Sequence, residues 1–327
     1  MTTITLGAAI NAGLRRAMNE DPRVLVMGED VGRLGGVFRV TAGLREEFGA
    51  ERVVDTPLAE SGIVGTAIGL ALRGYRPVCE IQFDGFIYPA FDQIVSQLAK
   101  TRARSGGAVT LPVVIRVPFG GGIGAVEHHS ESNEALFAHT AGLRVVACAD
   151  PADAAGLIRR AVACDDPVLF YEPKRRYWDK GEVDITMDLG DLPAMDRARV
   201  VRQGTDCTLV AYGPTVRTAL EASAAAQEDG VSVQVLDLRS LSPLDVDTLY
   251  RCAKATGRMV VVHEASTFLG MGAEIAAAVT EECFHALKCP VLRVGAYNMP
   301  YPPSRVEEEF LPDVNRVLDV VDRALGY

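Results

Sequence analysis

The stretch LRVVACADPADAAGLIRRAVACDDPVLFYEP, residues 143–173, decides the fold class. The apolar runs at its two ends predict two short buried strands. Between them, Asp150 and Pro151 are typical of a helix N-cap and first helical position, and they predict a helix over 151–164. Buried strands joined by a helix indicate a parallel sheet covered on both faces, so we expect an α/β protein.

The same alternation continues on both sides of this stretch. Before it, we predict helices over 6–20 and 88–103 and strands over 23–30, 76–83 and 111–118. After it, we predict strands over 207–214, 231–241, 258–265 and 290–296, alternating with helices over 215–230, 245–257 and 272–287. We therefore expect a first domain over 1–180, a polar linker with an edge strand over 181–202, and a smaller α/β domain over 203–327.

Composition excludes several classes of protein. The chain has 327 residues, about the length of two domains, and a net charge of -10 without any basic run longer than residues 174–176. Nucleic acid binding needs clustered positive charge and is not expected. The seven cysteines form no C-x-x-C pair, which favours reduced thiols. With no apolar run of about 18 residues and no targeting pattern at its start, the chain is predicted to be cytoplasmic and not membrane-bound.

A glycine-rich segment, PFGGGIGAVEHHS at 118–130, follows a predicted strand. It matches neither a P-loop nor G-x-G-x-x-G. It is either a flexible turn or a loop whose backbone approaches a ligand and aims His128, His129 and Ser130 at it. Metal binding by the two histidines is disfavoured, because adjacent residues on a loop point apart and no carboxylate or cysteine completes a set by spacing.

Aromatic residues cluster after another predicted strand, in EIQFDGFIYPAFDQI. Phe83, Phe86 and Tyr88 are most simply core residues. Gln82 and Asp84 lie between strand and aromatics, however, and such a mixed surface suits a flat heterocycle stacked on one ring.

Glu60, in DTPLAESGIVG, is a carboxylate inside an apolar, glycine-punctuated segment. One interpretation is a solvated acid in the first turn of a helix that Thr56 caps. The other is a carboxylate that Leu58 and Ile63 partly desolvate and that shares a proton with a bound base. The local pattern leaves both open.

Five motifs together resemble the beta subunit of thiamin diphosphate-dependent 2-oxo acid dehydrogenases, the decarboxylating component of those complexes. They are GEDVG...GGVFRVTAGL, DTPLAESGIVGTAIGLAL, EIQFDGFIYPAFDQIVSQLAKTRARSGG, HHSESNEALFAHTAGLRVV and DLRSLSPLD...VVVHEA, and they cover essentially the whole chain. The resemblance implies a transketolase-like pyrimidine-binding domain with a parallel sheet, followed by a smaller transketolase C-terminal domain.

The resemblance also implies roles for individual residues. Glu60 matches the glutamate that hydrogen-bonds N1′ of the aminopyrimidine and favours the imino tautomer that deprotonates the thiazolium C2. Leu58 matches a contact in the pyrimidine pocket, Gln82 a polar neighbour, and Phe86 the aromatic beside the ring, where some relatives have Tyr. His129 matches the histidine near C2 that binds the substrate carboxylate or assists transfer to lipoamide.

A missing motif indicates a partner. Relatives that bind the cofactor alone carry Gly-Asp-Gly, which holds the Mg-diphosphate half, and this chain lacks it. The resemblance therefore implies an alpha subunit that supplies this half in an α2β2 assembly, and a lipoyl-bearing acyltransferase core as the acceptor. Two alternatives are a self-sufficient transketolase-like enzyme, which would need the missing motif, and a non-catalytic scaffold subunit.

Two further expectations rest on the resemblance. One is a structural potassium ion held by backbone carbonyls near TLPVV and ACDDP, with Leu111, Val113, Val114, Ala161, Cys164 and Asp166 as ligands. The other concerns the substrate: YEPKRRYW at 171–178 is more similar to branched-chain 2-oxo acid enzymes, with pyruvate dehydrogenase as the alternative.

Overall fold

A seven-stranded sheet forms the centre of the first half of the chain. In the computed structural model, which describes residues 1–327, its strand order is β12-β6-β7-β5-β4-β2-β3. The strands are β2 (Val24–Gly28), β3 (Val53–Asp55), β4 (Arg76–Glu80), β5 (Val114–Phe119), β6 (Arg144–Ala147), β7 (Val168–Pro173) and β12 (Ser240–Ser242). All neighbours pair in parallel except β12 with β6. The predicted parallel sheet is therefore confirmed.

Helices cover both faces of this sheet. On one face α1 (Leu6–Glu20) packs against α6 (Pro151–Ala163), with Leu14 and Ile158 in a common buried cluster. The predicted cap of α6 is confirmed, because the Asp153 N–H donates to Asp150 Oδ1 (2.8 Å). The other face packs against α3 (Glu60–Leu72) and α5 (Glu134–Ala138). Apolar side chains therefore pack against helices on both faces of the sheet, as buried parallel strands require.

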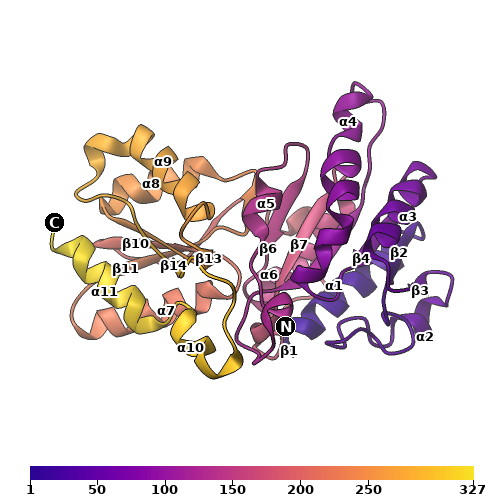
Figure 1. The fold of residues 1–327 in the computed structure, drawn as a ribbon, viewed down its shortest axis with the longest axis horizontal. Coiled ribbons are helices and arrows are strands. Elements are labelled where there is room, and N and C mark those ends of the chain that lie inside the picture. The colour runs from indigo at the N-terminus through magenta and orange to yellow at the C-terminus, as the bar shows by residue number, and fades with distance from the viewer.

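The second half repeats this architecture on a smaller sheet, with the order β14-β13-β10-β11-β9. Its strands are β9 (Arg199–Arg202), β10 (Cys207–Ala211), β11 (Val233–Asp237), β13 (Met259–Ser266) and β14 (Leu292–Ala296). Figure 1 shows it between two helix pairs: α7 (Thr215–Glu228) with α11 (Val314–Leu325), and α8 (Val246–Thr256) with α9 (Met271–Cys283). Only the edge strand β9 pairs antiparallel.

The two halves are joined by more than one connection. β8 (Lys180–Val183) pairs with β1 (Thr2–Thr5), and β12, which follows β11 in the chain, adds to the edge of the first sheet. Arg239 lies before β12; it pairs with Asp153 at 2.6 Å and donates to the carbonyl oxygens of Ala194 and Arg197. One apolar cluster includes Tyr171 of the first sheet and Tyr212 of the second half. A continuous core of this kind resists relative motion.

One predicted helix differs in form. Residues 88–103 were expected to be a single α-helix, but the chain forms the 3₁₀ segment η1 (Asp84–Ala90), the π-helical segment η2 (Gln93–Leu98) and the short α4 (Thr101–Arg104). Pro89 lies inside η1 and has no N–H to donate, and the π-helical segment η2 begins four residues later. The remaining short elements are α2 (Leu44–Phe48), η3 (Glu127–His129), η4 (Lys174–Arg176), η5 (Leu189–Asp191), η6 (Phe284–Ala286), η7 (Ser304–Val306) and α10 (Glu307–Phe310). None of the helices combines the length and apolar character that crossing a bilayer requires.

Candidate functional site

The candidate residues gather at the carboxyl ends of neighbouring parallel strands. In the strand order, β3, β2, β4 and β5 are adjacent. Glu60 follows β3, Glu29 follows β2, Phe86 follows β4 and His129 follows β5. Ligands of open α/β sheets bind at this edge, because the loops that follow parallel strands converge there. The sheet order thus brings together four segments that are far apart in the sequence.

Glu60 is the first residue of α3 and only 8% of its surface is exposed. The prediction that Thr56 caps this helix is wrong, since the N-cap is Ala59, which offers no side-chain bond. Glu60 does lie in the first turn, but its low exposure differs from that of a fully solvated acid. The Glu60 carboxylate makes no hydrogen bond or ion pair within the chain, although the helix N-terminus favours its negative charge. Its bonding capacity is therefore free for a ligand.

A second carboxylate, Glu29, lies beside Glu60. Burial, and then the nearby charges of Glu60, Asp30 and Glu80, raise the pKa of Glu29. A raised pKa favours the protonated form of Glu29, in which its carboxyl can donate a hydrogen bond. The sequence places Glu29 in the motif GEDVG, but no role for it was predicted, because a single acid after a strand does not by itself indicate burial beside a second acid.

An aromatic and histidine cluster forms the next part of the site. The segment η1 packs against both α3 and η3, so Phe86 lies between the elements that carry Glu60 and His129. The His129 ring contacts Phe83 (ring centroids 4.5 Å apart) and Phe86 (5.0 Å), in both cases edge to face. Phe86 is half-buried, so part of its surface remains available to a ligand.

Gly85 sets the distance between η1 and the histidines. A Cβ atom on this residue would lie 2.3 Å from the backbone oxygen of His128, which is closer than real contacts allow. The absence of a side chain therefore lets the segment with the aromatics touch the segment with the histidines.

Asp84 does not belong to the mixed polar surface that the sequence predicted. Its side chain is fully buried and pairs with the equally buried Lys174, Nζ to Oδ1, at 3.0 Å. Burial raises the pKa of Asp84 to about 7 and lowers the pKa of Lys174, while each charge opposes the shift of the other. The Lys174 ammonium also lies 5.5 Å from the centre of the Phe83 ring. The buried Lys174–Asp84 pair therefore packs against the Phe83 ring of the aromatic cluster.

His129 has an unsatisfied atom in the site. Its Nδ1 is buried and has no hydrogen-bond partner. Burial, followed by the charges of His128 and Lys174, lowers the pKa of His129, which favours the neutral ring. His128 is exposed. His263 lies elsewhere: it is buried, contacts the Ala265 carbonyl, and burial lowers its pKa to about 4.

The other predicted cofactor contacts lie nearby. Gln82 is half-buried in the turn before η1, and Leu58 is 78% exposed two residues before Glu60. A carboxylate without a partner in the chain and a half-open aromatic ring fit an aminopyrimidine, which is flat and offers both donors and acceptors.

The six residues of the predicted potassium site lie in adjacent segments, because β5 pairs with β7. Several of their carbonyls already accept hydrogen bonds. The Val113 oxygen accepts from the Val168 N–H, the Ala161 oxygen from the Cys164 N–H, and the Cys164 oxygen from Arg76. A carbonyl oxygen has two lone pairs, so these bonds leave one free on each.

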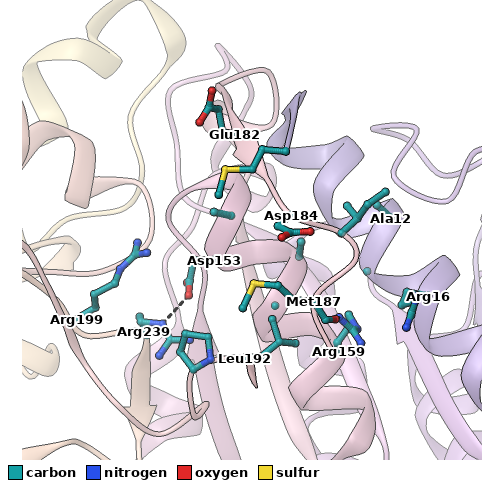
Figure 2. A pocket seen from close by; sticks show the side chains of 17 residues that line it. Ala12, Arg16, Asp153, Arg159, Glu182, Asp184, Met187, Leu192, Arg199 and Arg239 are labelled. Carbon is teal, nitrogen blue, oxygen red and sulfur yellow. Dashed lines mark hydrogen bonds and ion pairs between the residues drawn. The ribbon is translucent and has the colours of Figure 1, made fainter. Parts of the chain in front are cut away.

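A separate pocket of about 210 Å³ lies where the two halves meet (Figure 2). It contains none of the predicted site residues. Its arginines include Arg239, joined to Asp153 in Figure 2, and Arg159, which donates to Met187 and pairs with Glu20. Since these charges are satisfied within the chain, the pocket presents no free cation to a ligand.

The chain is similar to known proteins over nearly its whole length. Residues 2–179 match the transketolase pyrimidine-binding domain, and residues 196–317 match the transketolase C-terminal domain. The pyruvate dehydrogenase E1 component subunit beta of Leifsonia xyli is 59% identical over 98% of this chain and 94% of its own. The 3-methyl-2-oxobutanoate dehydrogenase subunit beta of Mycobacterium tuberculosis is 54% identical over 99% of this chain and 92% of its own.

A solved structure described as a split gene transketolase, an inactive beta4 tetramer, has the same fold. Its TM-score is 0.81 at 24% identity, and the match covers 99% of this chain and 98% of that one. The matches to both domain models and the identities over nearly the full length lead to one conclusion: the chain belongs to the beta subunits of the E1 component of thiamin diphosphate-dependent 2-oxo acid dehydrogenases.

Proposed function

We propose that this subunit binds the aminopyrimidine half of thiamin diphosphate and that Glu60 is the group that activates it. The observation that carries the proposal is the Glu60 carboxylate, buried at the start of α3 without a partner in the chain. A carboxylate with so little exposure and no partner in the chain gains most when a ligand engages it, and an aminopyrimidine nitrogen is a matching partner.

Within this proposal the chain has three tasks. Glu60 holds a proton at the pyrimidine N1′, Phe86 lies beside the ring, and His129 offers a neutral nitrogen to the substrate carboxylate or to the incoming lipoyl group. Leu58 and Gln82 complete the pocket wall. The bound cofactor supplies the carbon nucleophile that allows a 2-oxo acid to lose carbon dioxide.

The diphosphate half needs a second chain. Because no Gly-Asp-Gly occurs in the sequence, we propose that an alpha subunit supplies the Mg-diphosphate site in an α2β2 heterotetramer. The lipoyl-bearing acyltransferase is the proposed acceptor. The potassium ion, the cytoplasmic location and the domain limits given above remain predictions.

The proposal also concerns which 2-oxo acid the enzyme prefers. The two relatives at 59% and 54% identity are named for pyruvate and for a branched-chain 2-oxo acid. Branched-chain substrates remain our prediction from residues 171–178, with pyruvate as the alternative. Lys174 pairs with Asp84 and Arg175 with Glu264, so these two side chains of the segment act on the chain itself. Assays of the α/β complex with pyruvate, 3-methyl-2-oxobutanoate and 4-methyl-2-oxopentanoate give the ranking directly.

The test of the proposal is Glu60→Gln in the reconstituted α/β complex. We expect decarboxylation to fall by roughly two to four orders of magnitude, the range of general acid–base catalysis, while the heterotetramer still assembles. Glu51→Gln, at an exposed acid, is the matched control and should be silent. Near-normal turnover of Glu60→Gln would refute the mechanism and favour a scaffold subunit.

A further inference from the structure

The loop that carries His129 is closed at its base. The Gly120 N–H donates to the Glu131 carbonyl oxygen (2.9 Å), so residues 120–131 leave and return at almost the same point. His129 lies near the end of this loop, in η3. Compact loops of this type hold their shape through their own contacts or through contacts to neighbouring elements.

Three side chains from the second half of the chain bind the other end of the loop. The Glu307 carboxylate accepts from the Gly122 N–H with Oε1 (2.8 Å) and from the Gly124 N–H with Oε2 (3.0 Å). Glu264 Oε2 accepts from the Gly121 N–H (3.0 Å), and the Tyr301 hydroxyl oxygen accepts from the Gly122 N–H (3.3 Å). We call Glu264, Tyr301 and Glu307 the loop clamp.

The clamp side chains are themselves fixed. The Tyr301 hydroxyl donates to Glu307, and burial together with this bond raises the pKa of Tyr301, so the donor stays protonated. Arg175 pairs with Glu264 at 2.5 Å. Glu307 is buried and has no cationic partner, so the two loop N–H groups and the Tyr301 hydroxyl are what balance its charge.

The close approach of the clamp side chains to the loop explains why the loop contains glycines. A Cβ on Gly120 would lie 2.4 Å from Glu264 Oε2, and a Cβ on Gly121 would lie 1.9 Å from the Tyr301 hydroxyl. Gly122 and Gly124 have φ values of +83° and +72°, which other residues rarely adopt. Successive N–H groups in such a conformation form a concave anion site. The anions that fill it are carboxylates of the second domain.

We infer that the loop clamp positions His129 from the second domain, with Glu307 as its central positioning residue. This inference rests on the proposed role of His129. Because the loop is rich in glycine, it would sample many backbone conformations if the carboxylates of Glu264 and Glu307 did not bind it. A displacement of a reacting group by about 1 Å costs up to a hundredfold in rate. The second domain therefore contributes to the reaction without touching the substrate.

The test uses the full α/β complex and the variants Glu307→Ala, Glu307→Gln and Tyr301→Phe. Hydrogen exchange should show faster exchange for amides of residues 120–131, greatest in Glu307→Ala, smaller in Glu307→Gln, which keeps one acceptor, and smallest in Tyr301→Phe. Glu309→Gln, at an exposed acid of the same short helix, is the matched control and should leave the loop unchanged.

The kinetic readout is a double-variant cycle. Glu307→Ala alone should lower turnover by roughly ten- to a hundredfold. In combination with His129→Ala it should add nothing, because the clamp acts through His129. Losses that multiply, or loop amides that exchange as in the unsubstituted complex, would overturn the inference. If His129→Ala itself leaves turnover unchanged, the proposed role of His129 fails, and so does positioning for catalysis, while exchange still reports whether the clamp holds the loop.

Discussion

The Lys174 ammonium lies 3.0 Å from the Asp84 carboxylate, and both side chains are fully buried beneath the aromatic cluster. A buried pair of this kind gains little net energy from its attraction, since both charges lose their hydration. Removing either partner, however, leaves the other charge buried without compensation, which is strongly destabilising. The pair links the end of β7 to the start of η1, two of the segments that shape the candidate site.

We predict that Lys174→Met lowers the free energy of unfolding by about 3–5 kcal/mol, because it leaves the Asp84 carboxyl buried without its partner. Adding Asp84→Asn should restore part of this loss. Lys254→Met removes an exposed pair with Glu282 and serves as the control, with an expected change of about 0–1 kcal/mol. Urea unfolding of the three variants measures the difference; equal losses for Lys174→Met and Lys254→Met would contradict the prediction.

Gly85→Ala should reduce activity more than stability. The new Cβ would collide with the His128 backbone oxygen, and relief requires the loop with His129 to move. We expect turnover of the α/β complex to fall by roughly tenfold or more. Gly190→Ala, where a Cβ would meet nothing within 4 Å, is the control. Turnover and melting temperature are compared for both, and an active Gly85→Ala complex would show that the spacing is not required.

The pH dependence of stability should include a contribution from Glu134. Burial raises the pKa of Glu134 to about 7 from 4.5, although the bond donated by the Tyr212 hydroxyl opposes the shift. Between pH 4.5 and 7 the folded chain then binds more protons than the unfolded chain, so its stability falls as pH rises through this window.

Glu134→Gln imitates the protonated acid and should remove this fall. The variant should gain stability over the unsubstituted chain as pH rises from 4.5 to 7, by an amount on the order of 2–3 kcal/mol. Glu281→Gln, at an exposed acid of α9, should show no such trend. Urea unfolding at a series of pH values provides the measurement, and parallel curves for the variant and the unsubstituted chain would count against the assignment.

The isolated chain should not bind thiamin diphosphate tightly in the presence of Mg²⁺, because it contains only the proposed pyrimidine half of the site. Calorimetric titration should show weak or no binding to the lone chain and clear binding after the alpha subunit is added. Glu60→Gln should weaken binding to the complex, since its amide no longer supplies the carboxylate. Micromolar binding by the chain alone would contradict the half-site proposal.

Much of the fold follows from local sequence. Asp150 and Pro151 started a helix where predicted, and the strands around them paired in parallel. These features depend on apolar periodicity and on capping, which act over a few residues. The prediction of one α-helix over 88–103 was wrong because the helical spacing of apolar residues does not distinguish α-, 3₁₀- and π-helical hydrogen bonding.

The sequence by itself determined the α/β class, the family resemblance and Glu60 as the residue to examine. The tertiary structure decided which side chains around Glu60 are buried and which are paired. Three features depend on contacts between residues distant in the chain. They are the low exposure of Glu60, the pairing of Asp84 with Lys174, and the hydrogen bond from the Gly122 N–H to Glu307. Local pattern cannot contain such information, because burial and pairing are set by which strands lie side by side and which loops meet at their ends.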